Sequence, residues 1–354
     1  MEAAPDRVPA QLREIGERAE RRIIALLDSE LQRWAAVDPV LEEPFRELLR
    51  LVEAGGKRLR PAFCHWGHVA GGGDPTSSRA LDAGAAVELL HMMALIHDDV
   101  MDGSSLRRGQ ATAHRLLSDR HATSGWSGEA RRYGEGGAVL IGDFAFVYSD
   151  QLLDGASPQA RAVFDELRLE LCVGQYLDLA GTAMRTRDPE AALRIAVFKS
   201  GKYTVERPLH LGAALAGALD ELREPLSRIG LPLGQAFQMR DDILGVFGDP
   251  SLTGKPVGDD LREGKPTSML AFAARVASPT ERALLDRLGG DDLSQADIER
   301  LQGVIEDSGA RAMAESAIED LVSEALEALA AAPITEDARV GLKELAGFVA
   351  WRDR

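Results

Sequence analysis

The fold is decided by residues 81–102, LDAGAAVELLHMMALIHDDVMD. Apolar side chains occupy nearly every face of this segment when it is wound as a helix, so we predict a helix over 79–102 at the centre of a helical bundle. The segments 12–34, 160–181 and 315–332 are also long, rich in Ala and Leu, and free of proline. Because strand signals are nearly absent, we predict an all-α fold.

The chain reads as a single domain. Gly, Pro and Ser cluster at 71–78, 120–137 and 248–267, and we predict loops between helices at these three places. None of them has the length and composition of an interdomain linker, and no internal period indicates a solenoid. We therefore predict one domain over 1–354, with a peripheral N-terminal helix region at 1–38 and a core at about 39–350.

The composition excludes several classes of protein. Of the 354 residues, 45% are hydrophobic and 28% are charged, as in ordinary globular proteins. The net charge of −16 repels polyanions, so we expect no nucleic acid partner. Cys64 and Cys172 are too far apart for a disulfide framework or a zinc site, which fits a reducing cytoplasm. The charged N-terminus is no signal peptide, and no uninterrupted apolar run approaches a membrane span, so we expect a cytoplasmic protein outside the membrane.

Paired carboxylates lie at the end of the central helix. Asp98 and Asp102 are four residues apart on one helical face, about 6 Å apart along the axis. Two like charges on an apolar helix repel each other, and their burial requires a cation or strong hydrogen-bond donors. Oxygen ligands suit a hard ion such as Mg²⁺, which commonly bridges a few carboxylates to substrate phosphates. Taken alone, such a motif is more often a solvated acidic helix end than a metal site.

Two further helices carry acidic side chains. Asp241 and Asp242 end a second apolar helix, with Gln238 one turn earlier. On a third helix, Asp178 shares a face with Gln175. Three helices would thus present carboxylates to a common space, an arrangement expected of a clamp that holds a diphosphate through several Mg²⁺ ions.

Basic residues are grouped beside these acidic motifs. GGKRLRP at 55–61 places Lys57 and Arg60 on one face if a helix begins after the glycine pair, and together they suit a diphosphate. The alternative for this string alone is a basic helix start on the surface. His91 lies two turns before Asp98 on the same face. Other candidates for phosphate contacts are Arg107, Arg108, Lys199, Ser200, Lys202, Lys255 and Lys265.

Five separated motifs occur in the order typical of one family: GGKRLRP, HDDVMD with LRRG, GQYLDL, FKS and FQMRDDILGVFGD. In these motifs the chain resembles the trans-type polyprenyl diphosphate synthases, over most of its length from residue 55 to residue 267. The resemblance implies the isoprenoid synthase type I fold, an all-α homodimer in which a single-domain helical bundle surrounds a deep central cavity. It also implies a Mg²⁺-dependent condensation of isopentenyl diphosphate with an allylic diphosphate (dimethylallyl, geranyl or farnesyl).

The resemblance implies roles for individual residues. The isopentenyl diphosphate site would consist of Lys57, Arg60, His91 and Arg108. Ligands of Mg²⁺, direct or through water, would be Asp98, Asp102, Asp178, Asp241 and Asp242. The allylic diphosphate would also contact Arg107, Lys199, Ser200 (where the family usually has threonine), Gln238, Lys255 and Lys265. The residues expected to act in catalysis are Asp98, Asp102, Arg107, Lys199 and Asp241, and the proton is expected to leave to the departing diphosphate.

The match departs from the family pattern at one position. Gly245 stands where the second acidic motif usually has a third aspartate, which leaves one metal contact in doubt. Asp249 could compensate if the helix continues that far. However, the sequence there also indicates the end of a helix. The departure favours two alternatives: a class I terpene cyclase, whose metal motif the segment loosely resembles, and a silent regulatory subunit of a hetero-oligomeric synthase. A cyclase has no use for Lys57, Arg60, His91 and Arg108.

The positions preceding Asp98 are expected to set the product length. Ala94 and Leu90 lie one and two turns back, with Met93 on the flank, and all three are expected to form the floor of the cavity. One helical turn is roughly the length of one isoprene unit. Because methionine is intermediate in size, we expect geranylgeranyl diphosphate, with C15 and C25 products as neighbours, and we expect Met93→Ala to lengthen the product.

Overall fold

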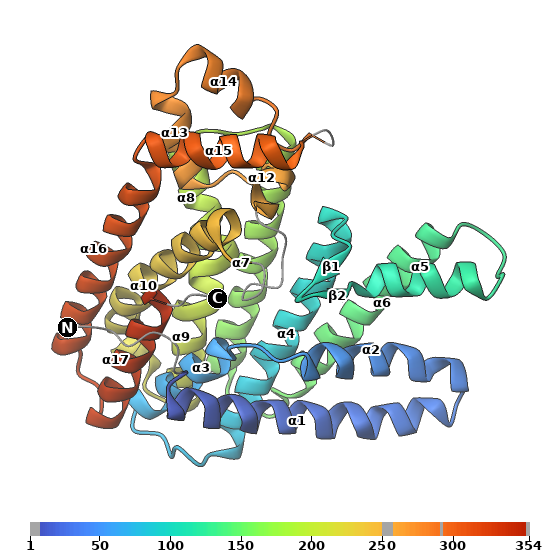
Figure 1. Ribbon diagram of the computed structural model, residues 1–354. Coiled ribbons are helices and arrows are strands. Elements are labelled where there is room, and N and C mark those ends of the chain that lie inside the picture. The colour runs from blue at the N-terminus through green and yellow to red at the C-terminus, as the bar shows by residue number, and fades with distance from the viewer. Residues whose placement is uncertain (1–7, 250–257, 291–292, 352–354) are drawn as a thin grey trace.

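The computed structural model describes residues 8–249, 258–290 and 293–351, and it is almost entirely helical (Figure 1). In the first half of the chain the elements are α1 (Ala10–Ala35), the 3₁₀-helix η1 (Pro39–Leu41), α2 (Glu42–Glu53), α3 (Leu59–Ala70), α4 (Ser78–Asp102), β1 (Leu106–Arg107), β2 (Gln110–Ala111), α5 (Ala113–Thr123), α6 (Ala130–Gln151) and α7 (Pro158–Ala183). In the second half they are α8 (Pro189–Ala196), the π-helix η2 (Val197–Glu206), α9 (Arg207–Leu215), α10 (Leu219–Phe247), α12 (Asp259–Glu263), α13 (Ser268–Val276), α14 (Pro279–Leu285), α15 (Gln295–Asp307), α16 (Ala310–Ala331) and α17 (Glu336–Trp351). The predicted all-α fold is confirmed.

Helix α4 is the central helix that the sequence predicts. It packs against α1, α3, α6 and α9, and most of its side chains are buried. Ser77 begins it by accepting a hydrogen bond from the Ala80 amide, and Gly103, with φ 66°, ends it in the left-handed conformation that favours glycine. Among the described residues, α4 alone is long and apolar enough to span a membrane by length and composition, although charged residues such as Asp82 and Glu88 interrupt it. However, 67% of its most apolar window is buried in the protein, as in a core helix.

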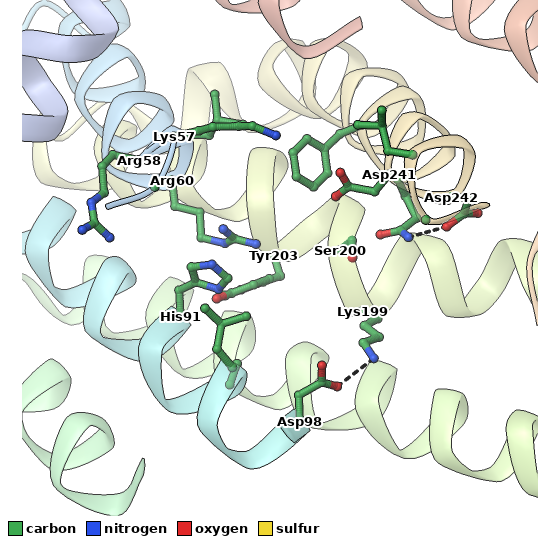
Figure 2. A pocket seen from close by; sticks show the side chains of 18 of the residues that line it. Lys57, Arg58, Arg60, His91, Asp98, Lys199, Ser200, Tyr203, Asp241 and Asp242 are labelled. Atoms are coloured by element: carbon green, nitrogen blue, oxygen red, sulfur yellow. Dashed lines mark hydrogen bonds and ion pairs between the residues drawn. The ribbon is translucent and has the colours of Figure 1, made fainter. Parts of the chain in front are cut away.

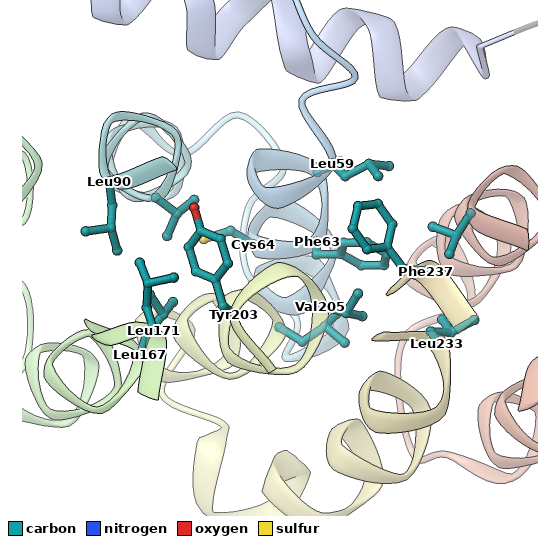
Figure 3. Close-up of a cluster of buried hydrophobic side chains, with 14 of the residues drawn as sticks. Leu59, Phe63, Cys64, Leu90, Leu167, Leu171, Tyr203, Val205, Leu233 and Phe237 are labelled. Carbon is teal, nitrogen blue, oxygen red and sulfur yellow. The ribbon is translucent and has the colours of Figure 1, made fainter. Parts of the chain in front are cut away.

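The hydrophobic core lies where α3, α4, α7, η2 and α10 meet (Figure 3). In this cluster Phe63 and Leu90 have no exposed surface, and Leu171 and Tyr203 are almost as deeply buried. Full burial of one such apolar side chain contributes about 1.5–3 kcal/mol before entropy is counted. Cys64 also lies here, and burial raises the pKa of its thiol to about 12. Both cysteines are free, as predicted.

The loop predicted over 120–137 is wrong at both ends. Helix α5 continues to Thr123 and α6 begins at Ala130, so the glycines at 134 and 137 are inside α6. A Cβ on Gly134 would lie 2.2 Å from the His114 carbonyl oxygen, and one on Gly137 would lie 2.6 Å from Leu117 Cδ1. These glycines therefore permit two helices to pack closely.

The other two predicted loops are largely confirmed. Residues 71–77 connect α3 to α4 without regular structure. Within 248–267 the short helix α12 interrupts the loop, and residues 250–257 lie outside the described residues. Helix α15 begins at Gln295, and Ser294 and Asp297 form a capping box at its start.

Candidate active site

A cavity with a volume of about 910 Å³ is lined by side chains of α1, α3, α4, α7, α8, η2, α10, α12 and α17. It brings together most of the residues that the sequence singled out. The cavity is lined by Lys57, Arg60, His91, Ala94, Asp98, Arg107, Arg108, Asp178, Lys199, Ser200, Gln238, Asp241, Asp242 and Lys265. Figure 2 shows Lys57, Arg58 and Arg60 toward the upper left, Asp98 at the bottom, and Asp241 and Asp242 at the upper right.

Lys199 joins the first acidic motif to α7. Its ammonium lies 3.0 Å from Asp98 Oδ1 and 2.5 Å from Asp178 Oδ2. Gln175 donates a further hydrogen bond of 2.8 Å to Asp98 Oδ1. The carboxyl ends of α4 and α7 are thereby held beside each other at the cavity mouth.

The π-helix η2 carries Lys199 and Ser200 to the cavity. A Cβ on Gly174 of α7 would lie 2.3 Å from the Lys199 backbone nitrogen, so only glycine permits this approach. Gly201 and Gly234 likewise bring η2 against α10. π-Helical turns are rare, and those that occur are frequently found at functional sites. Here the π-helix lies between the two acidic motifs in the sequence.

The environment of the first motif shifts the pKa values of its two carboxylates in opposite directions. Burial would raise the pKa of Asp98, but Lys199, Lys265 and Arg107 hold it well below its usual range. Burial and the neighbouring Asp98 raise the pKa of Asp102 to about 7. Asp102 therefore has too little positive charge around it to be fully ionised at neutral pH. A bound cation would lower its pKa and stabilise the carboxylate.

The second acidic motif faces the first across the cavity. Asp241 and Asp242 lie in the last two turns of α10, and Gln238 Nε2 donates a hydrogen bond of 2.6 Å to Asp242 Oδ1. Burial raises the pKa of Asp242 to about 8; the bond from Gln238 opposes this shift, and the charges of Asp260 and Asp241 add to it. This carboxyl also lacks compensating positive charge.

The carboxylate of Asp260 occupies the space that a side chain at Gly245 would fill. A Cβ on Gly245 would lie 1.8 Å from Asp260 Oδ2. Asp260 reaches this position from α12, and Lys265 lies 3.6 Å from Asp260 and 3.8 Å from Asp102. The Asp260 carboxylate thus lies beside the position of the missing aspartate, although Asp260 is 15 positions later in the sequence. Helix α10 ends at Phe247, so Asp249 lies beyond the helix and is exposed.

The donor set fits a hard divalent cation. All the acidic donors are carboxylate oxygens, which Mg²⁺ prefers. In the described ranges no three acidic or histidine side chains converge closely enough to hold a metal by themselves. Mg²⁺ usually takes one or two carboxylates together with substrate phosphates and water, so the arrangement fits ions that are bound with a diphosphate.

The basic side of the cavity is built from a turn and a hairpin. Gly55, with φ 79°, turns the chain before α3, and Arg108 donates a hydrogen bond to its carbonyl oxygen. Arg108 and Gly109 both have positive φ, as a two-residue β-hairpin turn requires. Helix α3 begins at Leu59, so the prediction that Lys57 and Arg60 share one helical face is wrong: Lys57 precedes the helix.

Arg60 and His91 lie deeper on this side. Arg60 Nη2 donates a hydrogen bond of 2.8 Å to Thr204 Oγ1, and its guanidinium lies 4.3 Å from the centre of the Tyr203 ring. Burial and the charges of Arg60 and Arg108 lower the pKa of His91 well below its usual range. The imidazole is therefore neutral at pH 7 and can donate one N–H to an anion.

The remaining predicted residues lie partly at the cavity and partly away from it. Arg107 binds Asp99 through Nη2 at 2.6 Å and lies 3.4 Å from Asp98. Leu90 and Met93 are buried but do not line the cavity, so only Ala94 of the three expected floor residues reaches it. Met93 is five positions from Asp98, about 140° around the helix at 100° per residue, and faces away. Lys255 lies outside the described residues.

Several residues at the cavity have no role in the sequence interpretation: Arg58, Glu88, Tyr203, Thr204 and Asp260. Glu88 lies on the same helical face as His91, so the helical period of the sequence is enough to place it near the site. Tyr203 is similarly one turn beyond Lys199. Asp260 has no such periodic relation to the predicted residues, because it lies on α12 and only the packing of α12 against α10 brings it to the cavity.

Comparisons with known proteins agree with this geometry. A family model described as "Polyprenyl synthetase" matches residues 38–305. The chain is 34% identical to geranylfarnesyl diphosphate synthase of Aeropyrum pernix over 81% of this chain and 87% of that protein. It is 30% identical to nonaprenyl diphosphate synthase of Mycobacterium tuberculosis over 88% and 86% of the two chains. The crystal structure of geranylgeranyl pyrophosphate synthase from Corynebacterium glutamicum, complexed with isoprenyl diphosphate and magnesium, superposes with a TM-score of 0.91 at 35% identity, covering 96% of this chain and 99% of that chain.

Proposed function

The chain belongs to the polyprenyl synthetase family of prenyltransferases, and from this premise we propose that it condenses isopentenyl diphosphate with dimethylallyl, geranyl and farnesyl diphosphates to give geranylgeranyl diphosphate. The observation that carries the proposal is the presence of two separate anion sites in one cavity. The cradle of Lys57, Arg60, His91 and Arg108 offers positive charge and N–H donors without carboxylates suited to a metal. The acidic motifs lie apart from this cradle: Asp98 is toward the end of the helix that carries His91, and Asp241 and Asp242 are on α10.

The acidic motifs would hold the allylic diphosphate through Mg²⁺. Direct or water-mediated ligands would be Asp98, Asp102, Asp178, Asp241 and Asp242. We add Asp260, whose carboxylate stands beside Gly245 where the usual third aspartate would be. Mg²⁺ bound there supplies positive charge to the departing diphosphate. Arg107, Lys199, Lys265 and, by the family resemblance, Lys255 add cationic groups, while Ser200 and Gln238 add polar contacts.

The reaction then follows from charge. Lys199 and Arg107 stabilise the negative charge that develops as the allylic C–O bond breaks and its electron pair leaves with diphosphate. The isopentenyl double bond, oriented by Arg60 and His91, supplies the electron pair of the new C–C bond. The proton lost from the isopentenyl unit goes to the departing diphosphate, and the apolar wall of Ala94, Leu171 and Phe237 excludes water from the cation.

The product length follows from the floor between α4 and α7. Gln175 sets these helices side by side at the level of Asp98, so Ala94 and Leu171, each one turn further in, lie at the next level. Leu90 and Leu167 lie one turn deeper and are fully buried (Figure 3). A small Ala94 leaves room for growth, and the leucines below it stop the chain at an intermediate length, for which we propose C20.

We also propose a homodimer. Exposed apolar side chains gather on two neighbours of the cavity: Val139, Leu140 and Val147 on α6, and Leu169, Val173, Tyr176 and Leu179 on α7. Leu140 is 60% exposed and Leu169 is 63% exposed, and apolar surface of this kind marks interfaces between proteins. We further propose that residues 1–354 form one catalytic domain and that the enzyme is cytoplasmic.

The test is incubation of purified protein and Mg²⁺ with labelled isopentenyl diphosphate and, separately, each of the three allylic primers. Chromatography of the dephosphorylated products is expected to give a C20 alcohol from every primer. A dominant product of another length would contradict the C20 assignment. A hydrocarbon released from an allylic diphosphate alone would instead indicate a terpene cyclase, and no product at all a regulatory subunit.

A further inference from the structure

Arg58 has an unusual backbone for its position in the basic cradle. It lies between Lys57 and Arg60, directly before α3, with φ 49° and ψ 38°. Residues other than glycine seldom adopt this left-handed conformation unless the surrounding structure imposes it. The turn that aims Lys57 and Arg60 into the cavity thus depends on whatever holds Arg58.

A buried ion pair holds the Arg58 side chain. Its Nη1 lies 2.5 Å from Glu88 Oε1, and its Nη2 lies 3.0 Å from Glu20 Oε2 and 2.5 Å from the Val52 carbonyl oxygen. Arg58 is 5% exposed and Glu88 is 2% exposed. The guanidinium therefore ties the turn to α1, to the end of α2 and to α4.

The same pair adjoins the other cradle residues. Glu88 lies one turn before His91 on α4, so one helix anchors the ion pair and presents the imidazole. A Cβ on Gly56 would lie 3.1 Å from Arg108 Nη2 and 3.5 Å from Arg58 Nη1, so both guanidinium groups face the same turn. The second oxygen of Glu88 is buried and accepts no hydrogen bond from any described residue.

Stability alone does not account for this arrangement. A buried ion pair is often no more stabilising than an apolar pair of the same size, because desolvation offsets the attraction. A buried pair does fix geometry, and here it fixes the turn between two anion-binding side chains. We propose that Arg58 and Glu88 are positioning residues that set the geometry of the isopentenyl diphosphate cradle, an inference that rests on the proposed function of that cradle.

Glu88→Gln separates positioning from simple charge. Removing a carboxylate makes the cradle more positive, so an effect of charge alone would lower the KM for isopentenyl diphosphate. Loss of positioning would raise it. A misplacement of about 1 Å can reduce the rate about a hundredfold. We expect a smaller displacement here, and therefore a rise of about tenfold in the KM for isopentenyl diphosphate. The KM for the allylic substrate should change less than about twofold, because Glu88 is ten positions before Asp98, about 15 Å along α4.

Gly16→Ala perturbs Arg58 without changing any charge. The new Cβ would lie 2.9 Å from Arg58 Cβ and displace it. We expect a rise in the KM for isopentenyl diphosphate in the same direction as for Glu88→Gln. This variant also decides the inference if Glu88→Gln fails to fold, which thermal unfolding would reveal.

The matched control is Glu170→Gln. Glu170 is similarly buried and pairs with Lys202 at 2.5 Å and Arg207 at 2.6 Å, away from the cavity. It should lower the unfolding temperature but leave both KM values unchanged. An unchanged or lower KM for isopentenyl diphosphate in Glu88→Gln, or an equal rise in Glu170→Gln, would overturn the inference. If the wild-type protein incorporates no isopentenyl diphosphate, the proposed function itself fails.

Discussion

Replacing Asp260 by asparagine should weaken Mg²⁺-dependent activity, because this carboxylate takes the place of the aspartate that Gly245 lacks. At about 4 Å and an effective dielectric constant of 20, one carboxylate attracts a divalent cation by about 8 kcal/mol, twice the value for unit charges. Desolvation offsets most of this attraction. Residues that support a metal site through water or hydrogen bonds typically change affinity or activity 10–100-fold, so we expect a loss of about 10–100-fold in kcat/KM for the allylic substrate at limiting Mg²⁺.

The double variant Gly245→Asp with Asp260→Asn tests the positional argument. A side chain at 245 would begin 1.8 Å from the present Asp260 Oδ2, so an aspartate there would place its carboxylate in the same region. We expect the double variant to recover most of the lost activity. Gly245→Asp alone should be impaired, because two carboxylates would then compete for one space.

Steady-state rates measured over a Mg²⁺ titration provide the assay. The control is Asp249→Asn, which removes a nearby exposed carboxylate beyond the end of α10 and should leave the Mg²⁺ dependence unchanged. Equal Mg²⁺ dependence of Asp260→Asn and the wild type would refute the reasoning. So would a stronger effect of Asp249→Asn, since Asp249 would then be the compensating residue.

Three other predictions concern the cavity and the surface. Lys199→Gln removes the cation that bridges Asp98 and Asp178, so kcat should fall at least about a hundredfold. The control is Lys202→Gln, because the Lys202 ammonium pairs with Glu170 outside the cavity. Equal effects of the two variants in steady-state assays would count against the role of Lys199. Ala94→Phe fills the level one turn below Asp98 and should shorten the product by at least one isoprene unit; Met93→Ala should change it less, and an unaltered product profile in Ala94→Phe would remove this position from the argument. Leu140→Glu together with Leu169→Glu places charges on the exposed apolar sides of α6 and α7, so the double variant should elute as a monomer in size-exclusion chromatography with light scattering, whereas an unchanged dimer would place the interface elsewhere.

The sequence predicts the parts of the fold that depend on local pattern. Helix α4 follows from an apolar run with a capping serine at one end and a glycine at the other, and the positions of Asp98 and His91 follow from its period. The glycines at 134 and 137 lead to the wrong prediction of a loop. Glycine is common both in loops and where two helices pack closely, and only the packing of α5 on α6 distinguishes the two cases.

Contacts between distant segments are beyond what a pattern can predict. Gly245 reads as the loss of a metal ligand until α12 brings Asp260 beside it. The sequence predicts Lys57 on a helix, but α3 begins only after the left-handed Arg58, whose side chain is held by the buried Glu88 and by Glu20. In both cases a residue far away in the chain decides the local geometry.

The central claim is that one cavity binds two diphosphates at separate sites and joins them. The most direct measurement is a single turnover with labelled isopentenyl diphosphate and saturating geranyl diphosphate, in Mg²⁺ and in EDTA, for the wild type and for Arg60→Gln. We expect label to enter a longer allylic diphosphate only in Mg²⁺, with Arg60→Gln requiring far more isopentenyl diphosphate for the same rate. Consumption of geranyl diphosphate without incorporation of label would contradict the account.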